Sequence, residues 1–232
     1  MLIIGNGRMA THFSYYLSLL HIPFLQWSRK THHLCQLPSL IQQATHIVLL
    51  ISDSAIPTFL NNFKIENKII IHFSGLLSIP GIYSAHPLMT FTHDLYKKEC
   101  YQQIPFILEE GSLPIAKLLP KIPNQAYYIP SHLKDFYHAL CVISNNFSCL
   151  LWQKLFQEIK NTFHLPQEII LPFLQQSFHN LQKNPHGSLT GPLARGDFNT
   201  INKHLLALKN DDFQDIYQAF VNYYKTQQRG IE

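Results

Sequence analysis

The sequence begins with a short apolar run that leads directly into a glycine-rich turn. Residues 2–4, LII, are typical of a buried strand, and residues 5–10, GNGRMA, have the spacing G-x-G-x-x-A before a helical pattern. Gly5 permits a turn that a Cβ would block, and Gly7 permits close approach of the backbone to a pyrophosphate. Ala10 allows the helix to pack closely on the strand. This combination predicts an α/β domain that binds a dinucleotide, and a glycine-rich turn that arose by chance is the alternative.

Strand and helix patterns continue to alternate as far as residue 130. The expected strands cover residues 24–27, 46–51, 68–72, 82–85, 104–108 and 126–129, and the expected helices cover 9–20, 55–63 and 113–121. This alternation predicts a Rossmann-type, doubly wound, mostly parallel sheet over residues 1–130. Because ligands bind beyond the carboxyl ends of parallel strands, the segments 52–54, 72–75 and 86–88 should line one crevice.

The residues after the second strand indicate which dinucleotide is bound. Enzymes that use NAD usually carry an acid there, whereas this chain has Ser28, Arg29 and Lys30, which can hold a 2′-phosphate. We interpret the pattern as favouring NADP(H), with a solvated basic turn as the alternative. Asp53 or Ser54 should cap the following helix, and a cofactor contact is their second possible role. The expected cofactor contacts are Gly5, Asn6, Gly7, Arg8, Met9, Ser28, Arg29, Lys30, Ser52, Asp53 and Ser74.

After Pro130 the pattern becomes wholly helical, which predicts a second domain over residues 131–232. Ser131 should cap a long helix that runs to about Lys160. Further helices are expected at 167–183, 198–208 and 212–226. The segment 189–197, LTGPLARGD, is too rich in Gly and Pro for a helix, and Asp197 is a natural N-cap for the helix after it.

The long helix is apolar or uncharged on two faces. On an ideal helix the large apolar residues gather on one side: Phe136, Leu140, Ile143, Phe147 and Leu151. The opposite side is partly polar: His138, Val142, Asn145 and Cys149, with Asn146 at its edge. A domain of this size cannot easily bury both sides internally, so we predict a homodimer built on the helical domain. Phe147, Leu151 and Trp152 should lie at or beside the contact.

Several segments resemble one family of NADP oxidoreductases, in which a Rossmann-like domain precedes an uncharacterised helical domain. The matching segments are GNG at 5–7, SDSAI at 52–56, HFSG at 72–75, HPL at 86–88, YHA at 137–139, NNF at 145–147 and LTGPLARGD at 189–197. The family is related to pyrroline-5-carboxylate reductase, ketopantoate reductase and the deazaflavin-dependent NADP oxidoreductases. The resemblance implies a reductase whose helical domain closes the nicotinamide crevice and commonly dimerises, without specifying a substrate.

The sequence differs from the wider superfamily in one pattern on the long helix. Hydroxyacid dehydrogenases use a Lys with an Asn four residues later on the long helix, whereas Lys134 here lies elsewhere on that helix. We therefore do not expect lysine-assisted alcohol oxidation.

Hydride transfer also needs a proton donor, and histidine suits that role near neutral pH. The candidate catalytic residues are His138, His86, Asn145, Asn146 and Thr190, and Arg195 is a candidate to hold an acidic group of the substrate. The asparagines would orient the substrate carbonyl, with Thr190 assisting. The structural alternative is that His138 bonds a backbone carbonyl, the asparagines tie helices together, and Arg195 pairs with Asp197.

The charge, apolar runs, cysteines and histidines of the sequence argue against several classes of partner and site. The net charge of +4 comes without a Lys/Arg run, and no apolar run reaches the ~18 residues of a membrane span, so nucleic-acid and membrane partners are not expected. No signal peptide is apparent, and the four cysteines lack a C-x-x-C pair, which favours reduced, mostly packed thiols in the cytoplasm. The histidines lack metal-ligand spacing, so no metal is expected.

The leading hypothesis is therefore an NADPH-dependent reductase of a small C=O or C=N compound. The alternative is a non-catalytic NADP(H)-binding sensor or interaction protein on the same fold.

Overall fold

A computed structural model describes residues 1–63 and 65–229 of the chain. The chain forms two compact units, Met1–Leu151 and Trp152–Glu232. The first unit contains the sheet together with the first part of the long helical segment, and the second unit is helical.

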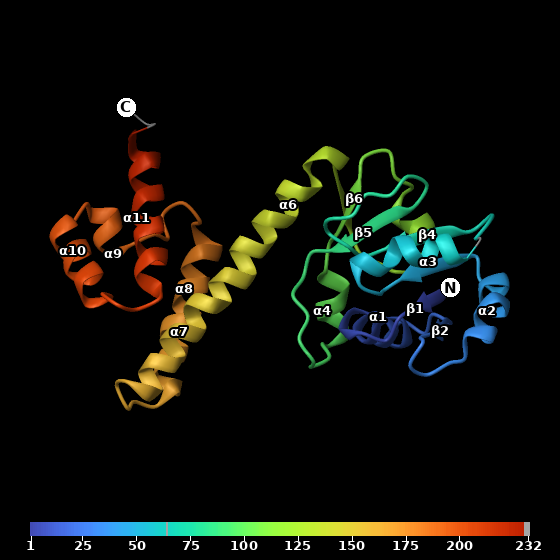
Figure 1. The fold of residues 1–232 in the computed structure, drawn as a ribbon, viewed down its shortest axis with the longest axis horizontal. Coiled ribbons are helices and arrows are strands. Elements are labelled where there is room, and N and C mark those ends of the chain that lie inside the picture. The colour runs from blue at the N-terminus through green and yellow to red at the C-terminus, as the bar shows by residue number, and fades with distance from the viewer. Residues whose placement is uncertain (64, 230–232) are drawn as a thin grey trace. The chain divides into compact units, whose positions relative to one another are not determined.

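In the described part of the first unit, seven strands form one sheet in the order β2-β1-β3-β4-β5-β6-β7 (Figure 1). The strands are β1 (Leu2–Ile4), β2 (Leu25–Trp27), β3 (His46–Leu49), β4 (Ile69–His72), β5 (Tyr83–Pro87), β6 (Phe106–Glu109) and β7 (Ala126–Ile129). Each neighbouring pair is parallel except β5 and β6, which are antiparallel. The predicted doubly wound, mostly parallel sheet is confirmed.

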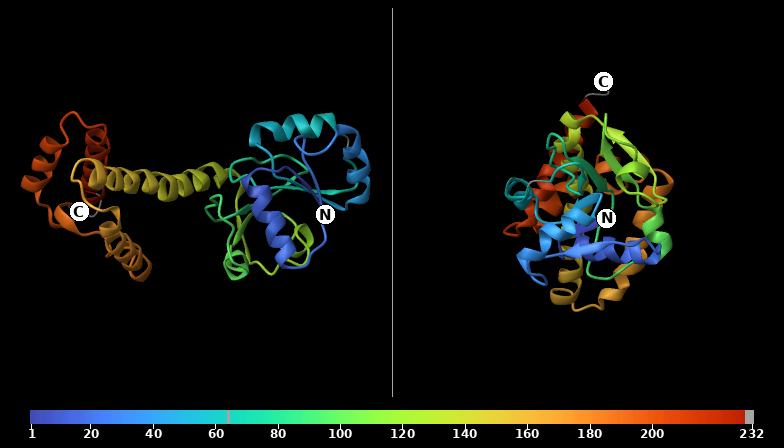
Figure 2. Two further views of the ribbon diagram at one scale, coloured as in Figure 1. Left: turned by 90° about the horizontal axis from the view of Figure 1, so that it is seen from below. Right: turned by 90° about the vertical axis from the view of Figure 1, so that its right-hand side faces the viewer.

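Helices cover both faces of this sheet (Figure 2). On one face lie α1 (Arg8–Leu19), α4 (Lys98–Gln103) and α5 (Ile115–Leu118), and on the other lie α2 (Leu37–Gln43) and α3 (Ile56–Asn62). Successive strand residues serve opposite faces, as the two-residue period of a strand requires: Ile3 packs in the α1 cluster, whereas Leu2 and Ile4 pack with α2 and α3. Two 3₁₀ turns, Leu34–Gln36 and Asp53–Ala55, precede α2 and α3.

The glycine turn lies at the point where the strand order reverses. After β1 the chain crosses to β2 on one side and then to β3 on the other, so a crevice opens beyond the ends of β1 and β3. Gly5 has a φ of +136°, and a Cβ built on it would lie 2.2 Å from the carbonyl oxygen of Leu50. The turn therefore requires glycine at this position.

The long helical segment is not one continuous α-helix. A 3₁₀ turn at Ser131–Leu133 leads into α6 (Lys134–Cys141), followed by a π-helical stretch at Val142–Phe147 and then by α7 (Ser148–Asn161). Apolar periodicity does not register i→i+5 bonding, so the prediction of an unbroken helix is wrong here. The predicted Ser131 cap is also wrong, because Pro130 occupies the N-cap position and no side chain caps the turn.

In the second unit, a 3₁₀ turn at Gln167–Ile170 is followed by α8 (Leu171–Lys183), α9 (Gly191–Arg195), α10 (Phe198–Ala207) and α11 (Phe213–Arg229). The segment predicted to be loop contains the short helix α9. Pro192 lies in its first turn, where a missing N–H costs no hydrogen bond, and Gly196 ends it in the left-handed conformation. The predicted Asp197 cap is confirmed, since the carboxylate accepts from the Thr200 amide at 3.1 Å.

The four cysteines are free: Cys35, Cys100, Cys141 and Cys149. Cys35 and Cys149 are exposed, so the prediction of mostly packed thiols is wrong for these two. None of the helices within residues 1–63 and 65–229 combines the length and the apolar character that a membrane crossing needs.

Candidate functional site

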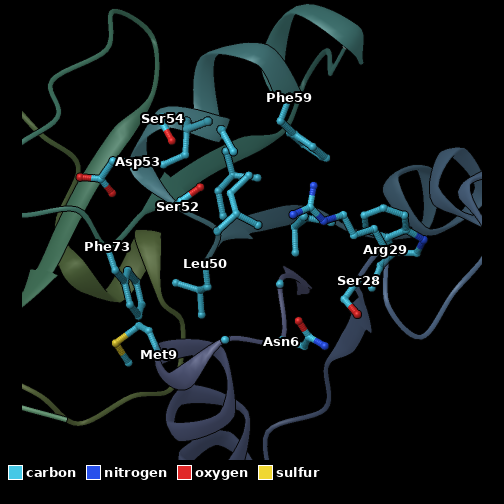
Figure 3. A pocket seen from close by; sticks show the side chains of 18 of the residues that line it. Asn6, Met9, Ser28, Arg29, Leu50, Ser52, Asp53, Ser54, Phe59 and Phe73 are labelled. Atoms are coloured by element: carbon cyan, nitrogen blue, oxygen red, sulfur yellow. The ribbon is translucent and has the colours of Figure 1, made fainter. Parts of the chain in front are cut away.

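A cavity of about 860 Å³ opens beyond the ends of the first strands (Figure 3). All eleven residues expected to contact a cofactor line it: Gly5, Asn6, Gly7, Arg8, Met9, Ser28, Arg29, Lys30, Ser52, Asp53 and Ser74. They come from the turn after β1, the turn after β2, and the segments after β3 and β4. The topology therefore brings together residues that lie far apart in the sequence.

The glycine turn and the start of α1 form the floor of this cavity. Gly7 is the N-cap of α1, and a Cβ at Gly7 would meet nothing within 4 Å, so the backbone is accessible from the cavity. The N-terminal amides of a 12-residue helix favour an anion at this position. Arg8 also lines the cavity, and its guanidinium donates to the Phe91 carbonyl at 3.2 Å, which ties the loop after β5 to α1.

The basic turn after β2 lies at one end of the cavity. Figure 3 shows the Arg29 side chain pointing into the cavity beside Ser28. Ser28 is buried, and its hydroxyl hydrogen-bonds the Thr31 hydroxyl at 2.8 Å, which in turn bonds His32 Nδ1 at 2.8 Å. These hydrogen bonds stabilise the turn. The Arg29 and Lys30 side chains remain exposed, and their positive charges suit an anionic group.

Asp53 has a different role from the helix cap that the sequence indicates. Neither Asp53 nor Ser54 caps α3, because Ala55 is the N-cap and no side chain bonds the first turn. The Ser74 hydroxyl instead donates to Asp53 Oδ2 at 2.5 Å, which joins the ends of β3 and β4. The helix-cap prediction is wrong because the sequence does not reveal that Ser74 lies within reach.

A cluster of titratable side chains lies next to this end of the cavity. His86 Nδ1 and the Tyr137 hydroxyl are 2.8 Å apart, and the rings of His86 and His138 have centroids 6.0 Å apart. Gly75, which follows the cavity residue Ser74, lies directly against both histidines. A Cβ at Gly75 would lie 2.5 Å from His138 Cδ2 and 3.1 Å from His86 Nε2, so this approach requires glycine.

Burial in this cluster favours the uncharged forms of His86 and Tyr137. Burial, followed by the charges of His138 and Lys134, lowers the pKa of His86 to about 4. Burial raises the pKa of Tyr137, so its hydroxyl keeps its proton. A protonated Tyr137 can donate to His86 Nδ1, which places the proton of the neutral imidazole on Nε2.

His72, at the end of β4 and two residues before Ser74, is fully buried. Its Nδ1 accepts from the Ser74 amide at 3.2 Å, and its Nε2 has no hydrogen-bond partner among the described residues. Burial and, to a smaller extent, the charge of Lys134 lower the pKa of His72 to about 4, although Asp53 and Glu109 act in the opposite direction. His72 is therefore neutral in the folded protein at pH 7.

The remaining candidate residues belong to other elements. Asn145 and Asn146 are exposed on the π-helical stretch, where Asn145 Nδ2 donates to Asn146 Oδ1 at 3.0 Å. Thr190 and Arg195 belong to the second unit, where Thr190 is the N-cap of α9 and Arg195 is its last residue. Sequence reasoning missed Tyr137 and Lys134 as members of the cluster, although both are close in sequence to His138.

Comparison with known proteins identifies the fold as that of solved NADP-linked reductases over nearly the whole chain. A candidate NADP oxidoreductase from Bacteroides fragilis is similar with a TM-score of 0.75 and 22% identity, covering 96% of both chains. A protein from Thermotoga maritima has a TM-score of 0.71 and 25% identity, covering 97% of this chain and 96% of its own. Pyrroline carboxylate reductase from Plasmodium falciparum, solved with NADP bound, has a TM-score of 0.60 and 14% identity, covering 99% and 97%.

The family model described as Domain of unknown function (DUF2520) matches residues 108–224, and the chain belongs to this family. No curated protein matches the sequence. The expected resemblance to NADP oxidoreductases with a Rossmann-like domain and an uncharacterised helical domain is confirmed.

The burial of His72 predicts a pH-dependent stability. In the unfolded chain the His72 side chain takes up a proton near pH 6.5, whereas in the folded protein it does so only near pH 4. The free energy of unfolding should therefore fall as the pH decreases from 6.5 to 4. For His72 the loss should be about 3 kcal/mol. Urea titrations of the wild type and His72→Asn at several pH values measure it.

Asparagine keeps an acceptor for the Ser74 amide but does not titrate, so His72→Asn should have a shallower pH dependence. Parallel curves for the two proteins between pH 6.5 and 4 would contradict this prediction. His179→Gln, at an exposed position on α8, is the control that should leave the dependence unchanged.

Proposed function

We propose that the protein is an NADPH-dependent oxidoreductase that reduces a small metabolite at a C=O or C=N bond. The main support for this proposal is that the large cavity and the histidine cluster meet at Ser74–Gly75. Ser74 lines the large cavity, and Gly75 lies against His86 and His138. A cavity that suits a dinucleotide is thus joined to a polar, titratable cluster rather than to apolar groups alone, which favours an enzyme.

The residues at the cavity fit NADP(H). The open backbone at Gly7 and the helix N-terminus suit the pyrophosphate, and Arg29 with Lys30 suits the 2′-phosphate. When bound, the cofactor would supply a hydride to the carbon of the substrate. The solved NADP complex of the Plasmodium falciparum reductase supports this assignment, because the two chains share a fold.

The proton for the reduced substrate should come from the His86–Tyr137–His138 cluster. Because the pKa of His86 is near 4, His86 carries no additional proton at pH 7 and is better suited to orienting the substrate through Nε2. We therefore assign the donor role to His138. Asn145 or Asn146 would orient the carbonyl or imine, since both lie on the π-helical stretch that directly follows α6, the helix of His138.

We further propose that residues 1–130 bind the cofactor and that residues 131–232 form a helical domain for substrate binding and dimerisation. In that domain Thr190 would assist the asparagines, and Arg195 would hold an acidic group of the substrate. The cytoplasm is the proposed location, and a small-molecule substrate and a second copy of the chain are the proposed partners.

A homodimer is favoured by the exposed apolar side chains of the long helical segment. All five members of the predicted apolar stripe are exposed: Phe136, Leu140, Ile143, Phe147 and Leu151. Phe147 is 50% exposed, and several large exposed apolar side chains within residues 136–151 favour a surface that a partner covers. A second copy would bury this stripe against its own equivalent.

The cofactor assignment predicts that NADPH binds at least tenfold more tightly than NADH. A charge-assisted contact to phosphate contributes about 1.5–3 kcal/mol, so Arg29→Ala should weaken NADPH binding about tenfold or more. The same substitution should change NADH affinity less than about twofold, which makes NADH the internal control. Calorimetric titration measures all four affinities, and equal wild-type affinities for the two nucleotides would rule the assignment out.

The catalytic assignment predicts that His138→Gln lowers kcat by about 100-fold, the effect of a positioned proton donor. Turnover is followed as NADPH oxidation against a panel of small carbonyl and imine compounds, with His86→Gln tested separately and His179→Gln as the exposed control. If neither His138→Gln nor His86→Gln reduces kcat to that extent, both histidines are structural. Tight NADPH binding without turnover on any compound would instead favour the sensor.

The dimer predicts a mass in light scattering twice that of one chain at micromolar concentration. Phe147→Glu combined with Leu151→Glu should shift the protein to the monomer, because each substitution places a charge in the apolar contact. Gln153→Glu adds the same charge at an exposed polar position of α7 and should leave the dimer intact. A wild-type protein with monomeric mass would refute the proposal.

A further inference from the structure

Lys134, the first residue of α6, is 3% exposed. Within the described part of the chain it is the one buried Lys or Arg. Its ammonium donates to the Leu77 carbonyl, to Ser84 Oγ at 2.8 Å and to Glu109 Oε1 at 2.8 Å. An ammonium has three N–H donors, and each of them has a partner here. The proposed function does not use this residue.

The partners of Lys134 come from three separate parts of the first unit. Glu109 ends β6, Ser84 lies in β5, and Leu77 lies between β4 and β5. Glu109 is itself held, since the Ser78 hydroxyl donates to its other oxygen at 2.8 Å. A buried ammonium is costly unless it is paired and fully hydrogen-bonded, so this arrangement strongly favours one position for the start of α6.

The same contacts reach the backbone next to Gly75. Ser84 Oγ accepts from Lys134 and donates its own proton to the Ser74 carbonyl at 3.2 Å. That carbonyl belongs to the peptide that joins Ser74 to Gly75. Lys134 therefore holds, through one hydroxyl, the peptide against which the His138 ring rests.

His138 lies four residues after Lys134, so the two side chains share one face of α6. The His138 ring approaches Gly75 so closely that a Cβ there would lie 2.5 Å from Cδ2. A small displacement of either α6 or the Ser74–Gly75 peptide would thus change how His138 faces His86.

We propose that Lys134 is a positioning residue: its bonds to Leu77, Ser84 and Glu109 fix both the start of α6 and the Ser74–Gly75 peptide, and so hold His138 beside His86. The importance of this positioning for catalysis rests on the proposed function. The positioning itself is independent of any substrate. Lys134 does not line the cavity, so its loss should affect the histidine cluster more than cofactor binding.

The test compares Lys134→Met, Ser84→Ala and Glu109→Gln with the wild type by NMR of the histidine imidazoles. His86→Gln and His138→Gln assign the signals, and the His179 signal is the control from the second unit. Lys134→Met should shift the His138 and His86 signals and raise the pKa of His86, because it removes a nearby positive charge. Ser84→Ala keeps that charge, so it should shift the His138 signal with a smaller change in the pKa of His86.

Glu109→Gln keeps the ammonium and its bonds to Ser84 and Leu77, so it should shift His138 less than Lys134→Met does. NADPH affinity should stay within twofold in all three variants, whereas Lys134→Met should lower kcat at least tenfold with a smaller change in KM. Should Lys134→Met not fold, Ser84→Ala decides, because it removes a single hydroxyl.

The proposal is overturned if the His138 imidazole signals of Lys134→Met coincide with those of the wild type. If Lys134→Met does not fold, the same result in Ser84→Ala overturns it. Failure of the proposed function looks different. In that case His138→Gln leaves kcat unchanged, while the imidazole signals still respond to Lys134→Met.

Discussion

The turn at Gly5 is the constraint on which the rest of the first unit depends. With a φ of +136° and no space for a Cβ beside the Leu50 carbonyl, the chain can leave β1 and enter α1 only through glycine. This close passage keeps the ends of β1 and β3 adjacent, at the place where the strand order reverses. The cavity lined by the start of α1 and by the basic turn after β2 lies at this point, so one backbone conformation determines where the cavity opens.

A second set of contacts joins the sheet to the long helical segment. The path from Asp53 through Ser74 and Ser84 to Lys134 crosses the ends of β3, β4 and β5 and reaches the first residue of α6. Each member is paired, which offsets the cost of burying polar groups in a place of low dielectric. The neutral state of His72 and His86 follows from the same burial. A buried cation therefore lies next to neutral histidines.

The residue pattern specifies most of the helices and strands of this fold, but not all of them. The alternation of apolar strands and helices predicted the sheet and the helical second unit, because burial on both faces of a parallel sheet leaves a pattern readable over a few residues. It failed at Val142–Phe147, since a π-helix has the same residue types as an α-helix, and at α9, where Pro192 begins a helix and Gly196 ends it. The helix cap predicted for Asp53 failed because its partner, Ser74, is 21 residues away.

The sequence by itself determined the glycine turn and the absence of an acid after β2, because each depends on residue types at short spacing. Only the tertiary structure decided that His86 pairs with Tyr137, that Gly75 lies against His138 and that Lys134 is buried with Glu109. These contacts join residues from β5, β6, α6 and the segment after β4, and the desolvation that lowers the pKa of His86 exists only once those elements pack. Local pattern specifies the elements, whereas the charge state of a site depends on what surrounds it in space.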